Sequence, residues 1–359
     1  MTILSRGFAL ARPLLHAMDA EKAHLLTIRA LQAAPRLASP AAPRRDSLTQ
    51  KLFGLTFPNP LGLAPGFDKN AEVPDAMLAQ GFGFVEVGTV TPRPQAGNPK
   101  PRLFRLVQDE AVINRMGFNN EGAAAVARRL DARRAKAGIV GVNIGANKDS
   151  EDRTADYAEG VRWFGPRASY LTINISSPNT PGLRGLQSRD ELVRLLDQVN
   201  AARHKLPRRL PVFLKIAPDL ADQELADIAA CTSKGEVDAV IISNTTLSRP
   251  ELHSRHSGEQ GGLSGKPLFA LSTRQLAKFH QLSGGRVPLI GVGGISDAET
   301  AWEKVLAGAS LIQLYSALVY KGPELLPDIL AGLASRLRES HLINISEAVG
   351  LQSAEWARD

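Results

Sequence analysis

The stretch Pro288-Leu-Ile-Gly-Val-Gly-Gly-Ile-Ser-Asp-Ala-Glu-Thr300 contains the unit from which the fold is predicted. Its apolar run, residues 289–292, has the composition of a strand that is buried on both faces. Two glycines follow, and residues 296–299 then have the Ser-x-x-Glu capping-box pattern that often begins a helix. A strand, a glycine turn and a helix in this order indicate one β/α unit of a parallel sheet.

Seven further apolar runs of the same kind occur along the chain, with helix-like stretches between them. They are residues 61–64, 84–87, 139–144, 171–175, 212–216, 239–243 and 311–314. Eight strands alternating with helices predict an α/β fold, the (β/α)8 TIM barrel, with an open doubly wound sheet as the alternative. Two long connections, residues 88–118 and 244–266, are then expected at the C-terminal face of the barrel, where active sites of barrels lie.

The N-terminal segment has a different character. Residues 1–45 contain seven basic and two acidic residues, and therefore five of the seven net positive charges of the chain. Two short helices are expected: residues 3–18, which Pro13 could interrupt, and a second helix that runs to about residue 34 with Asp19 as its N-cap. Its apolar residues share one face, and they are Ala23, Leu26, Ala30 and Leu31. A linker with Pro35, Pro40 and Pro43 follows.

Basic amphipathic helices without a nucleic-acid-binding motif favour contact with a membrane surface. No apolar run reaches the roughly 18 residues of a membrane span, and no pattern of a secretory signal is found. We therefore expect an N-terminal extension (residues 1–45), a barrel (46–340) and a C-terminal tail (341–359). The single cysteine, Cys231, excludes an internal disulfide and an iron–sulfur cluster, and no metal site is predicted.

Polar residues follow the predicted strands where a barrel active site would lie. Gly293 and Gly294 would let the backbone approach an anion, and the helix after Ser296 would point its positive N-terminus at the same place. Barrels often bind a cofactor phosphate between the loops after strands seven and eight. A phosphate site is therefore predicted, although a glycine turn alone could be no more than a tight turn.

Side-chain amides are the second unusual feature of these strand ends. They belong to Asn114, Asn143, Asn174, Asn179 and Asn244. Each alone could be a turn residue, but together they suit a planar ligand edged by N–H and C=O groups, such as a pyrimidine or an isoalloxazine. Lys215 could place a cation near the N1–C2=O edge of a flavin, or its ammonium could reach solvent. Lys69 could meet a substrate carboxylate, or pair with Asp68 or another acid.

Seven longer segments resemble the quinone-linked (class 2) dihydroorotate dehydrogenases, over residues 15–335. They are Phe67-Asp-Lys-Asn70, Thr91-Pro-Arg-Pro-Gln95, Lys100-Pro-Arg-Leu-Phe-Arg105, Asn114-Arg-Met-Gly-Phe-Asn-Asn120, Asn174-Ile-Ser-Ser-Pro-Asn-Thr180, Gly182-Leu-Arg184 and Gly291-Val-Gly-Gly-Ile295. The resemblance implies oxidation of (S)-dihydroorotate to orotate in pyrimidine (UMP) biosynthesis, with FMN as the hydride acceptor and a membrane quinone as the final electron acceptor.

The resemblance also assigns residues to the sites. FMN is expected to contact Ala64, Pro65, Gly66, Phe67, Asp68, Thr89, Asn143, Asn174, Lys215, Ser243, Gly265, Gly294, Tyr315 and Ser316. Dihydroorotate or orotate is expected to contact Lys69, Asn114, Arg115, Met116, Gly117, Phe118, Asn174, Asn179, Asn244 and Thr245. Two positions depart from the family pattern. Pro65 replaces the common Ala and removes a backbone N–H, and Ser243 replaces the common Thr but keeps the hydroxyl.

Ser177 falls at the position of the catalytic base and indicates the subclass. Soluble members of the family place a Cys there, whereas Cys231 lies in a predicted helix and is interpreted as an ordinary packed thiol. His24 and Arg105 resemble residues that line the quinone access channel, with a helix-surface position as the alternative for His24. We therefore expect a monomer without an iron–sulfur partner, bound peripherally to the cytoplasmic face of the inner membrane in a bacterium.

Two other functions stay open at this point. One is another FMN-dependent barrel oxidoreductase, which would act on a dihydropyrimidine or on tRNA dihydrouridine. The other is a membrane-surface scaffold without enzymatic activity. The first should bind FMN but not react rapidly with dihydroorotate, and the second should be colourless.

Overall fold

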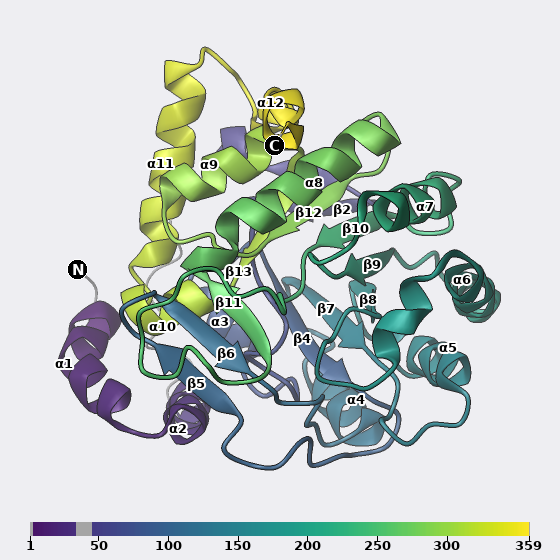
Figure 1. Ribbon diagram of the computed structural model, residues 1–359, viewed down its shortest axis with the longest axis horizontal. Coiled ribbons are helices and arrows are strands. Elements are labelled where there is room, and N and C mark those ends of the chain that lie inside the picture. Colours follow the sequence, from purple (N-terminus) through teal and green to yellow (C-terminus); the bar gives the residue numbers. More distant parts are fainter. Residues whose placement is uncertain (1–2, 34–44, 359) are drawn as a thin grey trace.

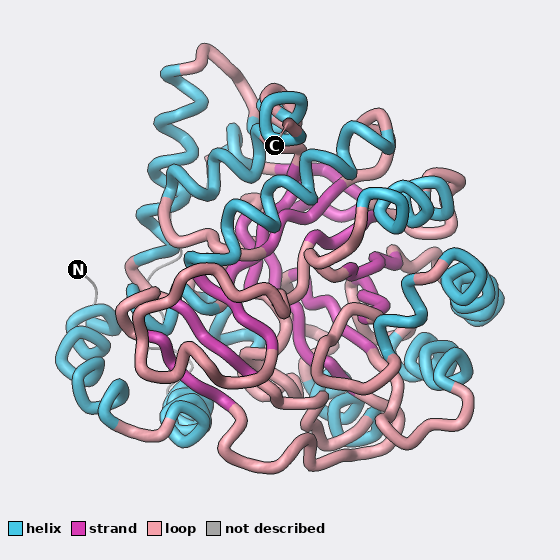
Figure 2. Tube along the Cα trace, in the orientation of Figure 1, coloured by secondary structure: helices cyan, strands magenta, loops and turns pink. Residues whose placement is uncertain are grey.

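The computed structural model describes residues 3–33 and 45–358 of the 359-residue chain. Within these ranges, eight parallel strands close into a barrel, and helices surround it (Figures 1 and 2). In the order in which they pair, the strands are β3 (Leu61–Leu63), β4 (Phe84–Val90), β7 (Ile139–Ile144), β8 (Tyr170–Asn174), β9 (Val212–Ile216), β10 (Ala239–Ile242), β12 (Leu289–Val292) and β13 (Ala309–Leu314), which pairs with β3. The predicted (β/α)8 barrel is therefore confirmed.

A helix follows each barrel strand and covers the outside of the barrel. These helices are α3 (Pro74–Ala79), α4 (Ala123–Ala132), α5 (Arg153–Phe164), α6 (Arg189–Arg203), α7 (Asp222–Thr232), α8 (Phe269–Ser283), α9 (Ala298–Leu306) and α11 (Leu325–Glu339). Every residue of β4, β8, β9 and β10 is buried, because one face meets the helices and the other fills the barrel. This explains why the strands are continuous apolar runs in the sequence.

A hairpin closes the N-terminal end of the barrel. Its strands are β1 (Gln50–Leu52) and β2 (Leu55–Phe57), preceded by the short 3-10 helix η1 (Asp46–Leu48). The Phe57 ring packs edge-on against Phe84, with ring centroids 5.3 Å apart, and Phe53 contacts Phe213 at 4.8 Å. The interior is therefore filled with aromatic side chains at this end. The cavity described below lies at the opposite end of the barrel.

The two long connections form a small antiparallel sheet over that opposite end. The first connection contains β5 (Leu103–Leu106) and β6 (Ala111–Asn114), and the second contains β11 (Gly262–Gly265), which pairs with β6. Figure 1 shows this sheet between the barrel and the N-terminal helices. The connections that the sequence placed at the active-site face thus fold together as one wall.

The N-terminal extension consists of α1 (Ile3–Ala17) and α2 (Ala20–Ala33), as expected. Pro13 lies inside α1 without ending it. The Asp19 carboxylate accepts a hydrogen bond of 2.9 Å from the Lys22 backbone N–H, which is the predicted N-cap contact. No helix in the described ranges is long and apolar enough to cross a membrane. The linker prolines Pro35, Pro40 and Pro43 lie outside the described residues.

The chain after α11 packs on the outside of the barrel. It contains the 3-10 turn η4 (Ile345–Ala348) and α12 (Ser353–Ala357). The Trp356 indole donates a 2.8 Å hydrogen bond to Glu303 and packs edge-on against Phe269. These contacts join the last helix to α8 and α9.

Candidate functional site

One cavity of about 760 Å³ connects the C-terminal end of the barrel with the N-terminal helices. Its inner part is lined by polar side chains at the strand ends, including Asn174, Ser177 and Lys215. Its outer part is lined by apolar side chains of α1 and α2, including Leu15 and Leu26. A polar ligand at the inner end and an apolar ligand at the outer end would therefore share one continuous cavity.

A chain of hydrogen bonds fixes the amides at the inner end. Asn174 at the end of β8 donates to the Thr89 hydroxyl at 2.9 Å and to the side-chain oxygen Oδ1 of Asn143 at 3.1 Å. The Thr89 hydroxyl itself donates to Asn143 at 2.6 Å. Because these partners leave little rotational freedom, the amide of Asn174 is held in one orientation at the cavity wall.

Below this layer, the barrel interior holds a carboxylate that sequence reasoning missed. Glu86 is fully buried and accepts hydrogen bonds from Asn143 at 2.8 Å, Tyr170 at 3.0 Å and Gln313 at 2.8 Å. Burial lowers the pKa of Lys215, while the charge of Glu86 acts in the opposite direction. Glu86 thus supplies the counter-charge for a lysine whose ammonium faces the cavity. An acid within the otherwise apolar run of β4 was the available signal, since a buried charge needs partners.

Ser177 lies in the loop after β8 and lines the cavity with only 6% of its surface exposed. Its Oγ accepts a 3.3 Å hydrogen bond from the backbone N–H of Asn179. The Asn179 amide in turn donates to the backbone carbonyl of Asn114 at 3.1 Å, which joins this loop to β6. A backbone donor at Oγ favours negative charge on that oxygen, which suits a hydroxyl that takes part in proton transfer.

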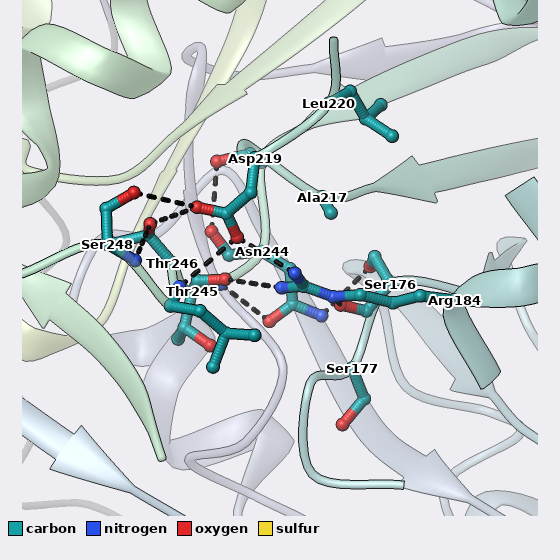
Figure 3. Close-up of polar contacts among 12 residues, drawn as sticks. Ser176, Ser177, Arg184, Ala217, Asp219, Leu220, Asn244, Thr245, Thr246 and Ser248 are labelled. Carbon is teal, nitrogen blue, oxygen red and sulfur yellow. Dashed lines mark hydrogen bonds and ion pairs between the residues drawn. The ribbon is translucent and has the colours of Figure 1, made fainter. Parts of the chain in front are cut away.

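The loop after β10 adds further polar groups to the same wall. The Asn244 amide donates to Ser176 Oγ at 2.9 Å and to Asn174 Oδ1 at 3.3 Å, and it accepts from the Thr245 N–H at 2.8 Å. Figure 3 shows Asn244 and Thr245 beside the Ser176–Ser177 segment. Ser243 also lines the cavity, but its hydroxyl donates to the backbone carbonyl of Asn244 at 2.9 Å.

The predicted phosphate subsite has the required glycines, and Ser296, which precedes α9, also lines the cavity. A Cβ at Gly294 would lie 2.4 Å from Phe269, and one at Gly265 would lie 2.4 Å from the Glu110 carbonyl oxygen, so both positions require glycine. The α9 terminus is capped by its own Asp297, which corrects the capping box expected at Ser296. The short helix α10 (Ser316–Lys321) also begins at the cavity wall, without a side-chain cap.

Two ionisable side chains stand where the polar and apolar parts of the cavity meet. Burial, together with the charge of Arg102, lowers the pKa of Lys69 to about 8. Burial and the nearby Lys69 lower the pKa of His24 to about 4. At neutral pH the Lys69 ammonium is therefore largely charged, whereas the His24 imidazole is neutral and suits an apolar channel. The His24 ring lies 3.4 Å from the Tyr315 hydroxyl.

Arg105 on β5 lines the cavity and contacts the end of α1. Its guanidinium donates to the backbone carbonyls of Leu15 at 2.7 Å and His16 at 3.2 Å, and also to that of Met18. These carbonyls end α1, so Arg105 caps that helix and complements its negative C-terminus. The residue therefore holds α1 in place while its side chain lines the cavity.

The structure brings most of the sequence-predicted site residues to this one cavity. Its walls include His24, Ala64, Pro65, Gly66, Phe67, Lys69, Thr89, Arg105, Asn114, Met116, Gly117, Phe118, Asn174, Ser177, Asn179, Lys215, Ser243, Asn244, Thr245, Gly265, Gly294, Tyr315 and Ser316. The N–H groups that flank Pro65, on Ala64 and Gly66, donate to backbone carbonyls. Residues 64–66 therefore offer no unbonded backbone N–H to a ligand.

Three predicted residues have other positions. Asp68 is fully buried, and its carboxylate accepts from the backbone N–H groups of Glu72 and Val73 at 2.8 Å, which folds the loop after β3. Asn143 lies behind Thr89 and Asn174 and acts on the cavity through them. The Arg115 side chain pairs with Glu259 at 2.8 Å and does not line the cavity.

A barrel with amides, a buried lysine and a glycine cradle at its C-terminal end is typical of cofactor-dependent barrel enzymes. The family model described as dihydroorotate dehydrogenase matches residues 47–337. This chain therefore belongs to the dihydroorotate dehydrogenase family. Membership confirms the predicted enzyme class, an oxidoreductase that acts on dihydroorotate, and it implies a flavin cofactor in general.

Relatives of known name agree over nearly the full length. The chain is 59% identical over 348 residues to a protein of Novosphingobium aromaticivorans and 56% identical over 361 residues to one of Mesorhizobium japonicum, and both are named dihydroorotate dehydrogenase (quinone). The alignments cover 96% and 99% of this chain and 99% of each relative. The crystal structure of dihydroorotate dehydrogenase from Eimeria tenella in complex with ferulenol is 41% identical, with a TM-score of 0.88, over 92% of this chain and 95% of that one.

Proposed function

We propose that this dihydroorotate dehydrogenase holds FMN at the barrel mouth, oxidises (S)-dihydroorotate to orotate with Ser177 as the base, and passes the electrons to a membrane quinone. The observation that carries the proposal is the single cavity that joins the polar strand ends to the apolar faces of α1 and α2. A water-soluble substrate and a lipid-soluble acceptor can then serve the same cofactor from different sides.

The cavity has residues that suit both the phosphate and the isoalloxazine ring of FMN. Gly265 and Gly294 form a cradle that any Cβ would fill, which suits a phosphate held by backbone groups. Among the described residues, none accepts a hydrogen bond from the Lys215 ammonium, although this side chain is buried at the cavity wall. The ammonium is therefore available to the edge of an isoalloxazine that gains negative charge on reduction.

The substrate side of the reaction follows from the remaining polar groups. Dihydroorotate loses a proton from C5 and a hydride from C6, and a bound flavin supplies the hydride acceptor. Ser177 Oγ takes the C5 proton as its own hydroxyl proton leaves to water. The backbone N–H of Asn179 stabilises the Ser177 oxygen during this exchange. Lys69 would bind the substrate carboxylate, and Asn114, Asn179 and Asn244 would hold the ring. Their contribution is mainly orientation.

The outer part of the cavity suits the quinone. Apolar side chains of both N-terminal helices line it, and the neutral His24 and the helix-capping Arg105 also line the cavity. Leu10, Leu14 and Leu25 are exposed on the same helices, so lipid contact would bury them. We infer a peripheral membrane protein, on the cytoplasmic face of the inner membrane in a bacterium, that acts as a monomer without an iron–sulfur subunit.

An anaerobic titration of the purified, FMN-loaded protein tests this function. Dihydroorotate should bleach the flavin absorbance, and a quinone added afterwards should restore it. Dihydrouracil and dihydrouridine, which lack the carboxylate, serve as controls and should leave the flavin oxidised. A protein that stays colourless after incubation with FMN, or a flavin that dihydroorotate does not reduce, would contradict the proposal.

A further inference from the structure

An ion pair behind the cavity wall joins the loops that follow three neighbouring strands. Arg184 lies in the 3-10 helix η2 (Leu183–Gln187), and Asp219 lies in the loop after β9. Their side chains are 2.9 Å apart, between Nη1 and Oδ2, and both are largely buried. Figure 3 shows the guanidinium reaching between the Ser176 segment and the loop after β10. Neither residue lines the cavity itself.

The guanidinium uses its other donors on the two loops that carry the reaction. Nε donates to the backbone carbonyl of Ser176 at 3.2 Å, and Nη2 donates to that of Thr245 at 3.1 Å. The Ser176 carbonyl belongs to the peptide unit whose nitrogen is that of Ser177. Arg184 therefore fixes the peptide plane that carries the base and, at the same time, the backbone of a substrate-side residue.

The carboxylate of Asp219 holds the same loop from the other side. It accepts hydrogen bonds from the Thr246 hydroxyl, from the Leu247 N–H at 3.2 Å and from the Ser248 hydroxyl at 3.4 Å. Thr246 is also tied to Leu263 of β11 by two backbone hydrogen bonds of 2.8 and 3.1 Å. The pair thus joins the loops after β8, β9 and β10 into one frame.

We propose that Arg184 and Asp219 are positioning residues that set the distance from Ser177 to the ring held by Asn244 and Thr245. This inference rests on the proposed function. A planar guanidinium with fixed donor directions suits the task, because it contacts two backbone carbonyls and a carboxylate at the same time. Lysine offers one point charge and cannot reproduce this set of directions. A small displacement of the base should slow proton transfer without removing the flavin.

The test measures flavin reduction in a single turnover, with FMN-loaded Arg184→Lys and Asp219→Asn. Each variant should reduce its flavin about tenfold to a hundredfold more slowly, the usual effect of misplacing a catalytic group by about 1 Å. FMN content should stay that of the wild type, and each variant should remain folded at the temperature of the assay. The matched control is Arg194→Lys, which changes an exposed pair with Glu191 on α6 and should leave the rate unchanged.

A double-mutant cycle separates positioning from a general structural role. In a Ser177→Ala background, Arg184→Lys should have almost no further effect, because its contribution passes through the Ser177 hydroxyl. Deuterium at C5 of dihydroorotate should slow flavin reduction more in Arg184→Lys than in the wild type. Deuterium at C6 should slow flavin reduction no more in Arg184→Lys than in the wild type. Independent effects of the two substitutions, or an unchanged rate in both single variants, would overturn the inference.

Two further outcomes are distinguishable. If Arg184→Lys is recovered without flavin, the double-mutant cycle is repeated with Asp219→Asn, which keeps the side-chain volume. Independent effects of Asp219→Asn and Ser177→Ala would then also overturn the inference. The proposed function is tested separately, because its failure would appear in the wild-type protein as a flavin that dihydroorotate does not reduce.

Discussion

The hydroxyl of Ser177 is the group to which we assign proton transfer. It lies against the cavity, and its Oγ accepts from the Asn179 N–H. Ser177→Ala should therefore leave FMN content and orotate affinity nearly unchanged. Flavin reduction by dihydroorotate should slow by about two to four orders of magnitude, the usual contribution of general-base catalysis. Stopped-flow absorbance measures this, and a rate within a few-fold of the wild type would remove Ser177 from the mechanism.

Lys69 gives substrate binding a predictable pH dependence. Its pKa of about 8 means that the ligand-free protein loses the ammonium proton as the pH rises through that value. A bound carboxylate favours the charged form, so binding takes up a proton and weakens above about pH 8. Orotate affinity, measured from the flavin spectrum, should fall with a limiting slope of about tenfold per pH unit.

Lys69→Met is the control for that pH dependence. It should weaken orotate binding at neutral pH and remove the slope above pH 8, because no ammonium remains to titrate. If Lys69→Met keeps the wild-type slope, another group is responsible for it, and the carboxylate is bound elsewhere.

The sequence motifs predicted well which residues lie at the site. They predicted less well the direction in which each side chain points. Ser177 and Lys69 line the cavity, whereas Arg115, in an equally specific motif, turns to Glu259. A motif gives the order of residues, but the side-chain direction depends on the β6 pairing with β11, a long-range contact. Glu86 and Asp219 were missed because their partners are distant in sequence.

At the scale of elements, one buried ion pair holds α2 on the barrel. Arg102 donates to Glu21 through Nε at 3.1 Å and through Nη2 at 2.8 Å, and both side chains are buried. Burial disfavours the Glu21 carboxylate, but Arg102 and Lys100 outweigh this and the pKa lies below its usual value. The contribution of this ion pair to the stability of the folded state is therefore present at neutral pH. It is lost as the pH falls through the pKa of Glu21 in the folded protein.

Glu21→Ala should release α2 from the barrel. Leaving Arg102 buried without its partner costs about 3–5 kcal/mol, which detachment of the helix would relieve. Limited proteolysis should then cut within residues 1–45 faster, and quinone reduction should slow, while dihydroorotate still reduces the flavin. Glu121→Ala, which removes a half-exposed partner of Arg129, is the matched control and should change neither. Equal protease resistance of Glu21→Ala and the wild type would contradict this role.

The accuracy of the element predictions follows from burial. The barrel strands are covered on both faces, so their apolar runs are visible locally, and β7, β9 and β12 have the predicted bounds. The strands β5, β6 and β11 were not predicted. They form inside long connections and are stabilised by pairing with one another rather than by a continuous apolar run.

At the scale of the whole molecule, charge and chemistry are separated along the chain. Residues 1–45 hold five of the seven net positive charges. Except for His24, all the predicted site residues lie beyond residue 60, on the barrel and its loops. The extension contributes the outer cavity wall and the exposed leucines, and the barrel contributes the strand-end groups. The two half-reactions should therefore be separable by cutting the chain between these parts.

Deleting residues 1–45 should leave a yellow barrel that dihydroorotate still reduces, because the glycine cradle, Lys215 and Ser177 all remain. Electron transfer to a long-tailed quinone in anionic vesicles should fall sharply, since the apolar channel wall and the basic helices are gone. Vesicle binding should weaken most visibly at low salt, where basic residues contribute most. A small water-soluble acceptor, which needs neither lipid nor the channel, should be reduced at nearly the rate of the full chain. If the truncated, FMN-loaded barrel instead reduces long-tailed quinones in vesicles as fast as the full chain, the extension is not the quinone access channel, and its basic helices serve another purpose.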